Sequence, residues 1–205
     1  MENKSINSNG HPYVDLGLPS GTLWATMNVG AKKPTESGLY FQWGDTIGYT
    51  KKQISKDKQF IWKNYKYSIN GSDENFSKYT TTGDTLELED DAAHVHMGGS
   101  WHIPSHNQIS ELLSNTNFEW ETQNGVSGMK FTSKKDKSKF IFIPVAGYAW
   151  GSEVYGSGTV GRVWSNMLCA EVDCGLSIYF YLEDISLGGD VYFRNNGFSV
   201  RGVIG

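Results

Sequence analysis

Cysteine and proline are scarce in this chain, and long apolar runs are missing. Among 205 residues there are 2 cysteines and 5 prolines. Two cysteines cannot make the disulfide framework of a small secreted scaffold, and no second cysteine pair completes a structural zinc site. No segment approaches the roughly 18 consecutive apolar residues that a membrane-spanning helix needs, so we expect no membrane insertion.

An excess of positive charge is also missing. The formal net charge is −4, with 18 basic against 22 acidic residues. Because binding to nucleic-acid phosphates needs a basic stripe, we expect no nucleic-acid partner. The first ten residues are polar and lack the apolar core of a secretion signal. They predict a flexible N-terminus over residues 1–10, with no signal peptide visible.

Glycine and aromatic residues are abundant instead. The chain has 24 glycines, 7 tryptophans, 11 tyrosines and 10 phenylalanines. Aromatic side chains bury a large area and keep a polar edge, which suits both a core beneath long loops and a binding face. The length fits one compact domain, so we expect a single domain over residues 1–205.

Helical periodicity is confined to one segment. Ser105 and Gln108 have the spacing of a capping box, and Ile109, Leu112 and Leu113 follow as an apolar stripe. Elsewhere, short extended runs predict strands at residues 139–143, 177–183, 191–194 and 198–203. Residues 50–90 are polar and poorly periodic and predict a loop-rich insertion. We therefore expect an α+β protein, with a mixed sheet of short strands, one or two helices and long loops.

The strand at residues 177–183 alternates between two kinds of side chain. Because successive side chains of a strand point to opposite faces, Ile178, Phe180 and Leu182 are expected to face the core. The opposite face would then display the other four side chains: Ser177, Tyr179, Tyr181 and Glu183. Exposed tyrosines on a rigid strand bring a large contact area at low entropy cost, so this face is a candidate binding surface.

Sequence blocks spread over nearly the whole chain, except residues 50–90, resemble one family. The blocks are HPYVDLGLPSGTLWAT at 11–26, YFQWGD at 40–45, GGSWHIPS at 98–105, IPVAG at 143–147, VWS at 163–165 and NGFSVR at 196–201. In this order they resemble a paralogous domain of surface proteins from gut Bacteroidetes. That domain is similar to the C-type-lectin-like variable proteins of diversity-generating retroelements. The formylglycine-generating enzymes share the same broad fold.

The resemblance implies a C-type-lectin-like fold and a non-catalytic ligand-binding module, with no cofactor and no metal. The variable region would span residues 163–201 and meet a cell-surface protein or glycan. The setting would be extracellular: an adhesin at a cell surface or the tail of a phage virion. Related proteins occur as monomers and trimers, so a homo-oligomer stays open. The candidate ligand-binding residues are Asn166, Met167, Leu168, Glu171, Asp173, Ser177, Tyr179, Tyr181, Glu183, Asp190, Tyr192 and Asn195. Arg201 is expected to support the scaffold, and the role of Arg194 stays open.

Two alternatives from other classes remain. Cys169 and Cys174 have the separation of the two catalytic cysteines in formylglycine-generating enzymes, so a copper-dependent oxidase is the first alternative. Glu171 and Asp173 weigh against it, because nearby negative charge raises the pKa of a thiol. The second alternative is a structural subunit of a surface fibre or virion, in which the same face makes subunit contacts.

Two other groups of residues invite a metal and are expected to hold none. His94 and His96 on a strand would place both imidazoles on one face, as zinc could use, but no third ligand is specified. The acidic run at residues 87–91 lacks the spacing and turn glycine of an EF-hand loop. Sugar-binding C-type lectins use a Glu-Pro-Asn or Gln-Pro-Asp tripeptide, and neither is present, so calcium-dependent sugar binding is not expected.

Overall fold

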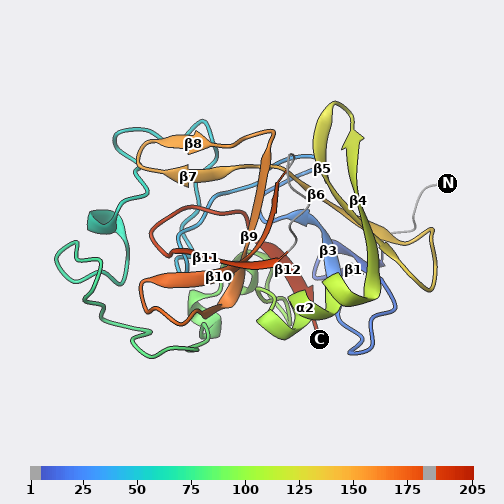
Figure 1. Cartoon of the computed structure of the whole chain (residues 1–205), viewed down its shortest axis with the longest axis horizontal. Helices are drawn as coiled ribbons and strands as arrows, with labels where there is room; N and C mark the ends of the chain where they lie inside the picture. The colour runs from blue at the N-terminus through green and yellow to red at the C-terminus, as the bar shows by residue number, and fades with distance from the viewer. Residues whose placement is uncertain (1–5, 182–187) are drawn as a thin grey trace.

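Antiparallel strands dominate the computed structural model, which describes residues 6–181 and 188–205 (Figure 1). About 40% of the chain is strand and 12% is helix. The α+β class that we expected is therefore wrong, and the protein is mainly β. The sheets are not mixed either, because every pair of described strands is antiparallel. Only one segment has a long helical stripe, whereas tight turns join several neighbouring strands, so antiparallel strands outweigh helices.

The first sheet brings the two ends of the chain together. Its order is β1-β2-β3-β12, so the last strand pairs with a strand near the N-terminus. Residues 6–8, which we expected within a flexible N-terminus, pair with β2 through a tight turn at Asn9 and Gly10. The bounds are β1 (Ile6–Ser8), β2 (His11–Asp15), β3 (Leu23–Asn28) and β12 (Arg201–Ile204).

The second sheet follows the predicted helix. Helix α2 (His106–Asn115) begins with the predicted capping box: the Ser105 hydroxyl accepts from the Gln108 N–H, and the Gln108 side chain accepts from the Ser105 N–H. The helix buries Ile109 and Leu112. The strands, in the order β4-β5-β6, are β4 (Thr116–Gln123), β5 (Val126–Ser133) and β6 (Phe140–Pro144). Strand β6 lies within one residue of the predicted segment.

The third sheet contains the candidate site. Its order is β11-β10-β9, with a short hairpin, β7-β8, as a separate sheet. In Figure 1 β7, β8, β10 and β11 lie on the left of the molecule, β9 runs near its middle, and the β4–β5 hairpin lies on the right. The bounds are β7 (Tyr148–Trp150), β8 (Glu153–Tyr155), β9 (Val160–Leu168), β10 (Cys174–Tyr181) and β11 (Gly188–Phe193).

The predicted insertion, residues 50–90, contains two 3-10 helices, η1 (Trp62–Asn64) and η2 (Leu88–Asp90). Helix α1 (Ala92–Met97) comes next and carries His94 and His96. The Asp91 carboxylate caps this helix by accepting the His94 N–H at 2.9 Å. Residues two apart on a helix do not face each other. The two rings accordingly contact different carbonyls, those of Trp101 and Thr46, so they do not share one face as they would on a strand.

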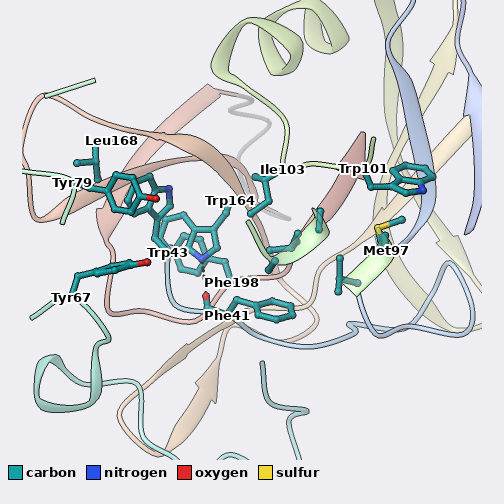
Figure 2. Close-up of a cluster of buried hydrophobic side chains, with 14 of the residues drawn as sticks. Phe41, Trp43, Tyr67, Tyr79, Met97, Trp101, Ile103, Trp164, Leu168 and Phe198 are labelled. Carbon is teal, nitrogen blue, oxygen red and sulfur yellow. Dashed lines mark hydrogen bonds between the residues drawn. The ribbon is translucent and has the colours of Figure 1, made fainter. Parts of the chain in front are cut away.

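An aromatic core lies against β9 and β10 (Figure 2). Trp164 stacks on Phe198 with ring centroids 3.9 Å apart, and its Nε1–H donates to the Phe41 carbonyl at 2.7 Å. Gly175 lets β10 approach this cluster, because a Cβ there would come within 2.8 Å of the Trp43 ring. The site therefore stands on tightly packed aromatic residues.

No helix in the described parts of the chain is long and apolar enough to cross a membrane.

Candidate functional site

Strand β10 separates a core face from a second face, as its alternation predicts. Ile178 and Phe180 are 0% and 1% exposed and belong to the core cluster that includes Val163 of β9. Tyr179 and Tyr181 point to the other face and are half-buried. Their rings touch, with centroids 5.8 Å apart.

An arginine holds the tyrosines of this second face. Arg162 of β9 lies directly opposite Tyr179 of β10, and Tyr192 of β11 lies opposite Gly175, so all three side chains share one face. The Arg162 Cζ lies 4.4 Å from the ring centroid of Tyr179 and 3.9 Å from that of Tyr192. Arg162 as a whole is 7% exposed, so its cation–π contacts are partly desolvated and help to hold both rings.

The β7–β8 hairpin continues the row of rings. The ring centroid of Tyr148 lies 5.5 Å from that of Tyr192 and 5.9 Å from that of Tyr155, and Trp150 lies 5.9 Å from Tyr155. Trp150 is 56% exposed and Tyr155 38% exposed. We call this connected set the aromatic face; its members are Tyr148, Trp150, Tyr155, Arg162, Tyr179, Tyr181 and Tyr192.

Sequence reasoning missed the hairpin part of the aromatic face. Tyr148 and Trp150 alternate around Ala149, and Tyr155 follows after a short turn, which is the period-2 pattern of a small hairpin. Their partnership with β11 could not be read from the sequence, because it depends on contacts between segments about 40 residues apart.

Three predicted contact residues are buried and cannot meet a ligand directly. Leu168 is 1% exposed and packs in the aromatic core. Ser177 is 0% exposed, because this short side chain lies on the central strand with the large Trp164 as its partner on β9. Asn195 is 4% exposed, and its carbonyl accepts a hydrogen bond from Gln42 Nε2 at 2.8 Å. These three belong to the scaffold.

The end of β9 and the loop that follows it carry other predicted residues. Asn166 and Met167 are half-buried, and their backbone joins the insertion: the Asn166 carbonyl accepts from the Leu86 N–H at 2.8 Å. Glu171 is exposed and Asp173 half-buried. Glu183, and the side chain of Asp190, lie outside what the structure describes.

The two candidates for oxidation chemistry, Cys169 and Cys174, are free thiols that are 5% and 4% exposed. Burial raises the pKa of the Cys174 thiol well above its usual range, and Asp173 and Cys169 add to the effect. The thiolate is the form that binds copper or attacks a substrate. This setting therefore weighs against the oxidase alternative.

Two groups of donor atoms are close enough together to suggest a cation site. The carboxylates of Glu87, Glu89 and Asp90 converge, but the Lys78 ammonium already lies 2.7, 3.2 and 2.6 Å from them. The donor atoms of Glu171, Asp173 and Cys174 lie within 4.8 Å of one another, and the raised pKa of Cys174 keeps that thiol protonated at neutral pH. Neither group is a ready cation site.

Arg194 and Arg201 are both 0% exposed. Arg201 donates to the Asn28 side chain and to the carbonyls of Ala25 and Phe142, all at 2.9–3.0 Å, and burial lowers its pKa to about 9. It supports the scaffold, as expected. Arg194 also supports it: its Nη1 donates to the Tyr79 carbonyl at 2.8 Å.

A cavity of about 220 Å³ lies elsewhere, between β2, β3 and α1. Its polar lining includes His11, Asn28 and His96, and its apolar lining includes Met27 and Met97. None of its lining residues belongs to the aromatic face, so the two features are separate.

Comparison of the chain with family models, with curated proteins and with solved structures finds no match.

Proposed function

We propose that the protein is a non-catalytic ligand-binding module whose aromatic face contacts a protein or glycan on a cell surface. The observation that supports this most is the row of rings from Trp150 to Tyr181, in which the Arg162 guanidinium joins Tyr192 to Tyr179. Tyrosine and tryptophan carry large amphipathic area with few rotatable bonds, so fixed rings lose little entropy on binding. A few such anchors dominate the affinity of a typical interface.

We further propose that the chain is a variable protein of the kind that diversity-generating retroelements produce. Two of the blocks that carry this resemblance bracket the region between Val163 and Arg201. Residues within these blocks, such as Trp164, Phe198 and Arg201, are 0–1% exposed. Between the blocks lie partly exposed residues such as Tyr179 and Tyr192. A buried frame around exposed positions is what a surface that tolerates substitution requires. The setting would be an extracellular adhesin or a phage virion.

The proposed contact set differs from the one that the sequence suggested. It keeps the partly exposed residues of the predicted set and gains Tyr148, Trp150 and Tyr155. The retained residues are Asn166, Met167, Glu171, Asp173, Tyr179, Tyr181 and Tyr192.

Binding of the fluorescently labelled protein to a panel of intact cells tests this proposal. We expect Trp150→Ala and Tyr192→Ala each to weaken binding by about 2 kcal/mol, or roughly 30-fold, because each removes an aromatic anchor. Phe118→Ala is the matched control, since Phe118 is 39% exposed on β4, outside the aromatic face. Loss of binding after protease treatment of the cells identifies a protein ligand, and loss after periodate oxidation identifies a glycan. Equal binding by all three variants and the unchanged protein would contradict the proposal.

The structural-subunit alternative makes a different prediction about the molecular mass of the protein in solution. A subunit that uses the aromatic face for assembly would form a symmetric oligomer, and Trp150→Ala would shift it toward monomer. Light scattering of both proteins separates the two functions. An unchanged mass together with weakened cell binding supports the binding module.

A further inference from the structure

Cys169 and Cys174 lie opposite each other at the turn that connects β9 to β10. The ladder ends with the pair Leu168 and Gly175, and one step further the Cys169 N–H donates to the Cys174 carbonyl at 3.1 Å. Hydrogen-bonded partners of an antiparallel pair have Cα atoms about 5.5 Å apart. Disulfides span Cα separations of roughly 4.4–6.8 Å, so the two positions suit a covalent bridge.

We propose that Cys169 and Cys174 are a site of reversible oxidation that closes this turn with an intramolecular disulfide. The oxidant would be a low-molecular-weight disulfide such as glutathione disulfide. Both cysteines are free and buried, and four residues, 170–173, separate them. The inference does not depend on which ligand the aromatic face binds.

The local hydrogen bonds can survive the oxidation. In the reduced form Cys169 Sγ donates to the Glu171 carbonyl at 3.3 Å and accepts the Glu171 N–H at 3.2 Å. Oxidation removes only the thiol proton. The Glu171 carbonyl still accepts the Cys174 N–H at 3.1 Å, and a bridged sulfur can still accept weakly from the Glu171 N–H. No buried polar group loses all its partners, so the bridge does not incur the penalty of an unsatisfied group.

Neighbouring segments hold the turn from both sides. The Leu168 N–H donates to the Asp84 carbonyl at 2.9 Å, and the Arg194 N–H donates to the Asp173 carbonyl at 2.9 Å. The Thr82 hydroxyl donates to the Ala170 carbonyl at 3.3 Å. Both cysteine backbones are therefore fixed before the sulfurs react, which favours an intramolecular bridge over two separate adducts.

The exchange proceeds in two balanced steps. The thiolate of one cysteine attacks a sulfur of glutathione disulfide, forms a mixed disulfide and releases one glutathione thiolate. The thiolate of the other cysteine then attacks the protein sulfur of that mixed disulfide and releases the second glutathione. In total the two protein thiols lose two protons and two electrons, and glutathione disulfide is reduced to two glutathiones. Because burial raises the pKa of Cys174, the exchange should be slow at neutral pH and faster in mild alkali.

The folded chain should favour the bridge over the unfolded chain. A six-residue loop closed by a disulfide removes conformational entropy from the unfolded state, and the same coupling makes the folded state promote the disulfide. The expected advantage is a factor of about ten or more in the glutathione redox equilibrium.

The test is equilibration of the purified protein in glutathione redox buffers, native and in denaturing urea, followed by alkylation of free thiols and intact-mass measurement. We expect a native species that lacks two hydrogens, carries no glutathione, and forms at a disulfide-to-thiol ratio about tenfold lower than in urea. Dithiothreitol should reverse it. A native population dominated by glutathione adducts or disulfide-linked dimers overturns the proposal, as does an equilibrium no more favourable than in urea.

Single-cysteine variants provide the matched controls. Cys169→Ser and Cys174→Ser can each take up at most one glutathione and cannot lose two hydrogens. The double variant should show no mass change in any buffer. A loss of two hydrogens in either single variant would assign the oxidation to another part of the chain and would also overturn the proposal.

Discussion

Aromatic side chains in this protein fall into two groups, one buried and hydrogen-bonded in the core and the other partly exposed. Trp43 Nε1–H donates to the Ser165 carbonyl and the Tyr65 hydroxyl donates to the Trp43 carbonyl, both at 2.9 Å. These side chains are at most 3% exposed, so their rings and hydrogen bonds fix the scaffold. Trp150 and Tyr155, in contrast, keep 56% and 38% of their surface exposed. The same residue types therefore build the core at one set of positions and offer contact area at another.

A buried carboxylate joins separate segments of the insertion at residues 50–90. Asp90 is 3% exposed; Lys66 and Lys78 each donate to it, and so does the Tyr79 hydroxyl at 2.7 Å. Burial alone would raise the pKa of Asp90, yet these donors outweigh it and hold the pKa well below its usual range. A carboxylate with a lowered folded-state pKa stabilises the fold at pH values above its unfolded pKa of about 4. That contribution is lost as the pH falls further.

Asp90→Asn should lower the free energy of unfolding by about 2 kcal/mol at neutral pH, because it removes charge-assisted hydrogen bonds. The difference from the unchanged protein should shrink below about pH 4, where Asp90 itself begins to be protonated in the unfolded chain. Urea unfolding of both proteins at neutral pH and below about pH 4 measures this difference in the free energy of unfolding. Asp73→Asn, at an exposed position of the same insertion, is the control. A deficit that is equal at both pH values would show that charge is not the cause.

Among the secondary-structure elements, those with a local signal were predictable. The capping box and apolar stripe predicted α2, and the apolar run before Pro144 predicted β6. The alternation of β10 correctly separated its core face from its second face. In each case the residues that carry the signal are close together in the sequence, within one or two helical turns or within a single strand.

Other elements were missed for two different reasons. The Asn9-Gly10 and Asn124-Gly125 pairs both have positive φ angles, 49° and 80°, and 50° and 79°, and they close the β1–β2 and β4–β5 hairpins. Asn-Gly between extended segments is a known hairpin signal, so these turns were readable from the sequence. Helix α1 was not, because six residues are too few to show a helical period.

The cap of α2 provides a test at the scale of an element. Ser105→Ala should destabilise the protein by about 1 kcal/mol, because it leaves the Gln108 N–H without its side-chain acceptor. Ser110→Ala, in the exposed middle of the same helix, should be neutral or slightly stabilising, since alanine has the higher helix propensity. Urea denaturation of both variants gives the comparison. Equal effects would show that the cap does not contribute.

For the molecule as a whole, burial of individual site residues depends on segments far apart in sequence. Ser177 is covered because Trp164 is its partner, and Leu168 because residues of the insertion pack on it. A period-2 pattern reports which face a residue is on, but not whether other segments cover that face. This is why the sequence predicted contacts at both positions, which the structure shows to be buried.

Arg194 joins the insertion to the third sheet through its side chain. Its Cζ lies 3.6 Å from the ring centroid of Phe76, and its backbone N–H donates to the Asp173 carbonyl. Arg194→Ala should cost about 3 kcal/mol through the cavity and the lost contacts, and should speed hydrogen exchange across residues 65–79 before the rest of the chain. Hydrogen–deuterium exchange mass spectrometry tests this, with exposed Lys63→Ala as control. Uniform acceleration over the whole chain would contradict a local role.

We propose that residues 163–201 form a fixed frame carrying exchangeable contact residues. Sequencing the gene's genomic neighbourhood tests it most directly, by searching for a near-copy of this coding segment beside a reverse transcriptase gene. We predict that such a copy exists and that its differences concentrate at partly exposed positions such as Tyr179, Tyr181 and Tyr192. The buried Ile178, Phe180 and Arg201 should be unchanged. Absence of a copy, or differences that fall equally on the buried positions, would contradict the claim.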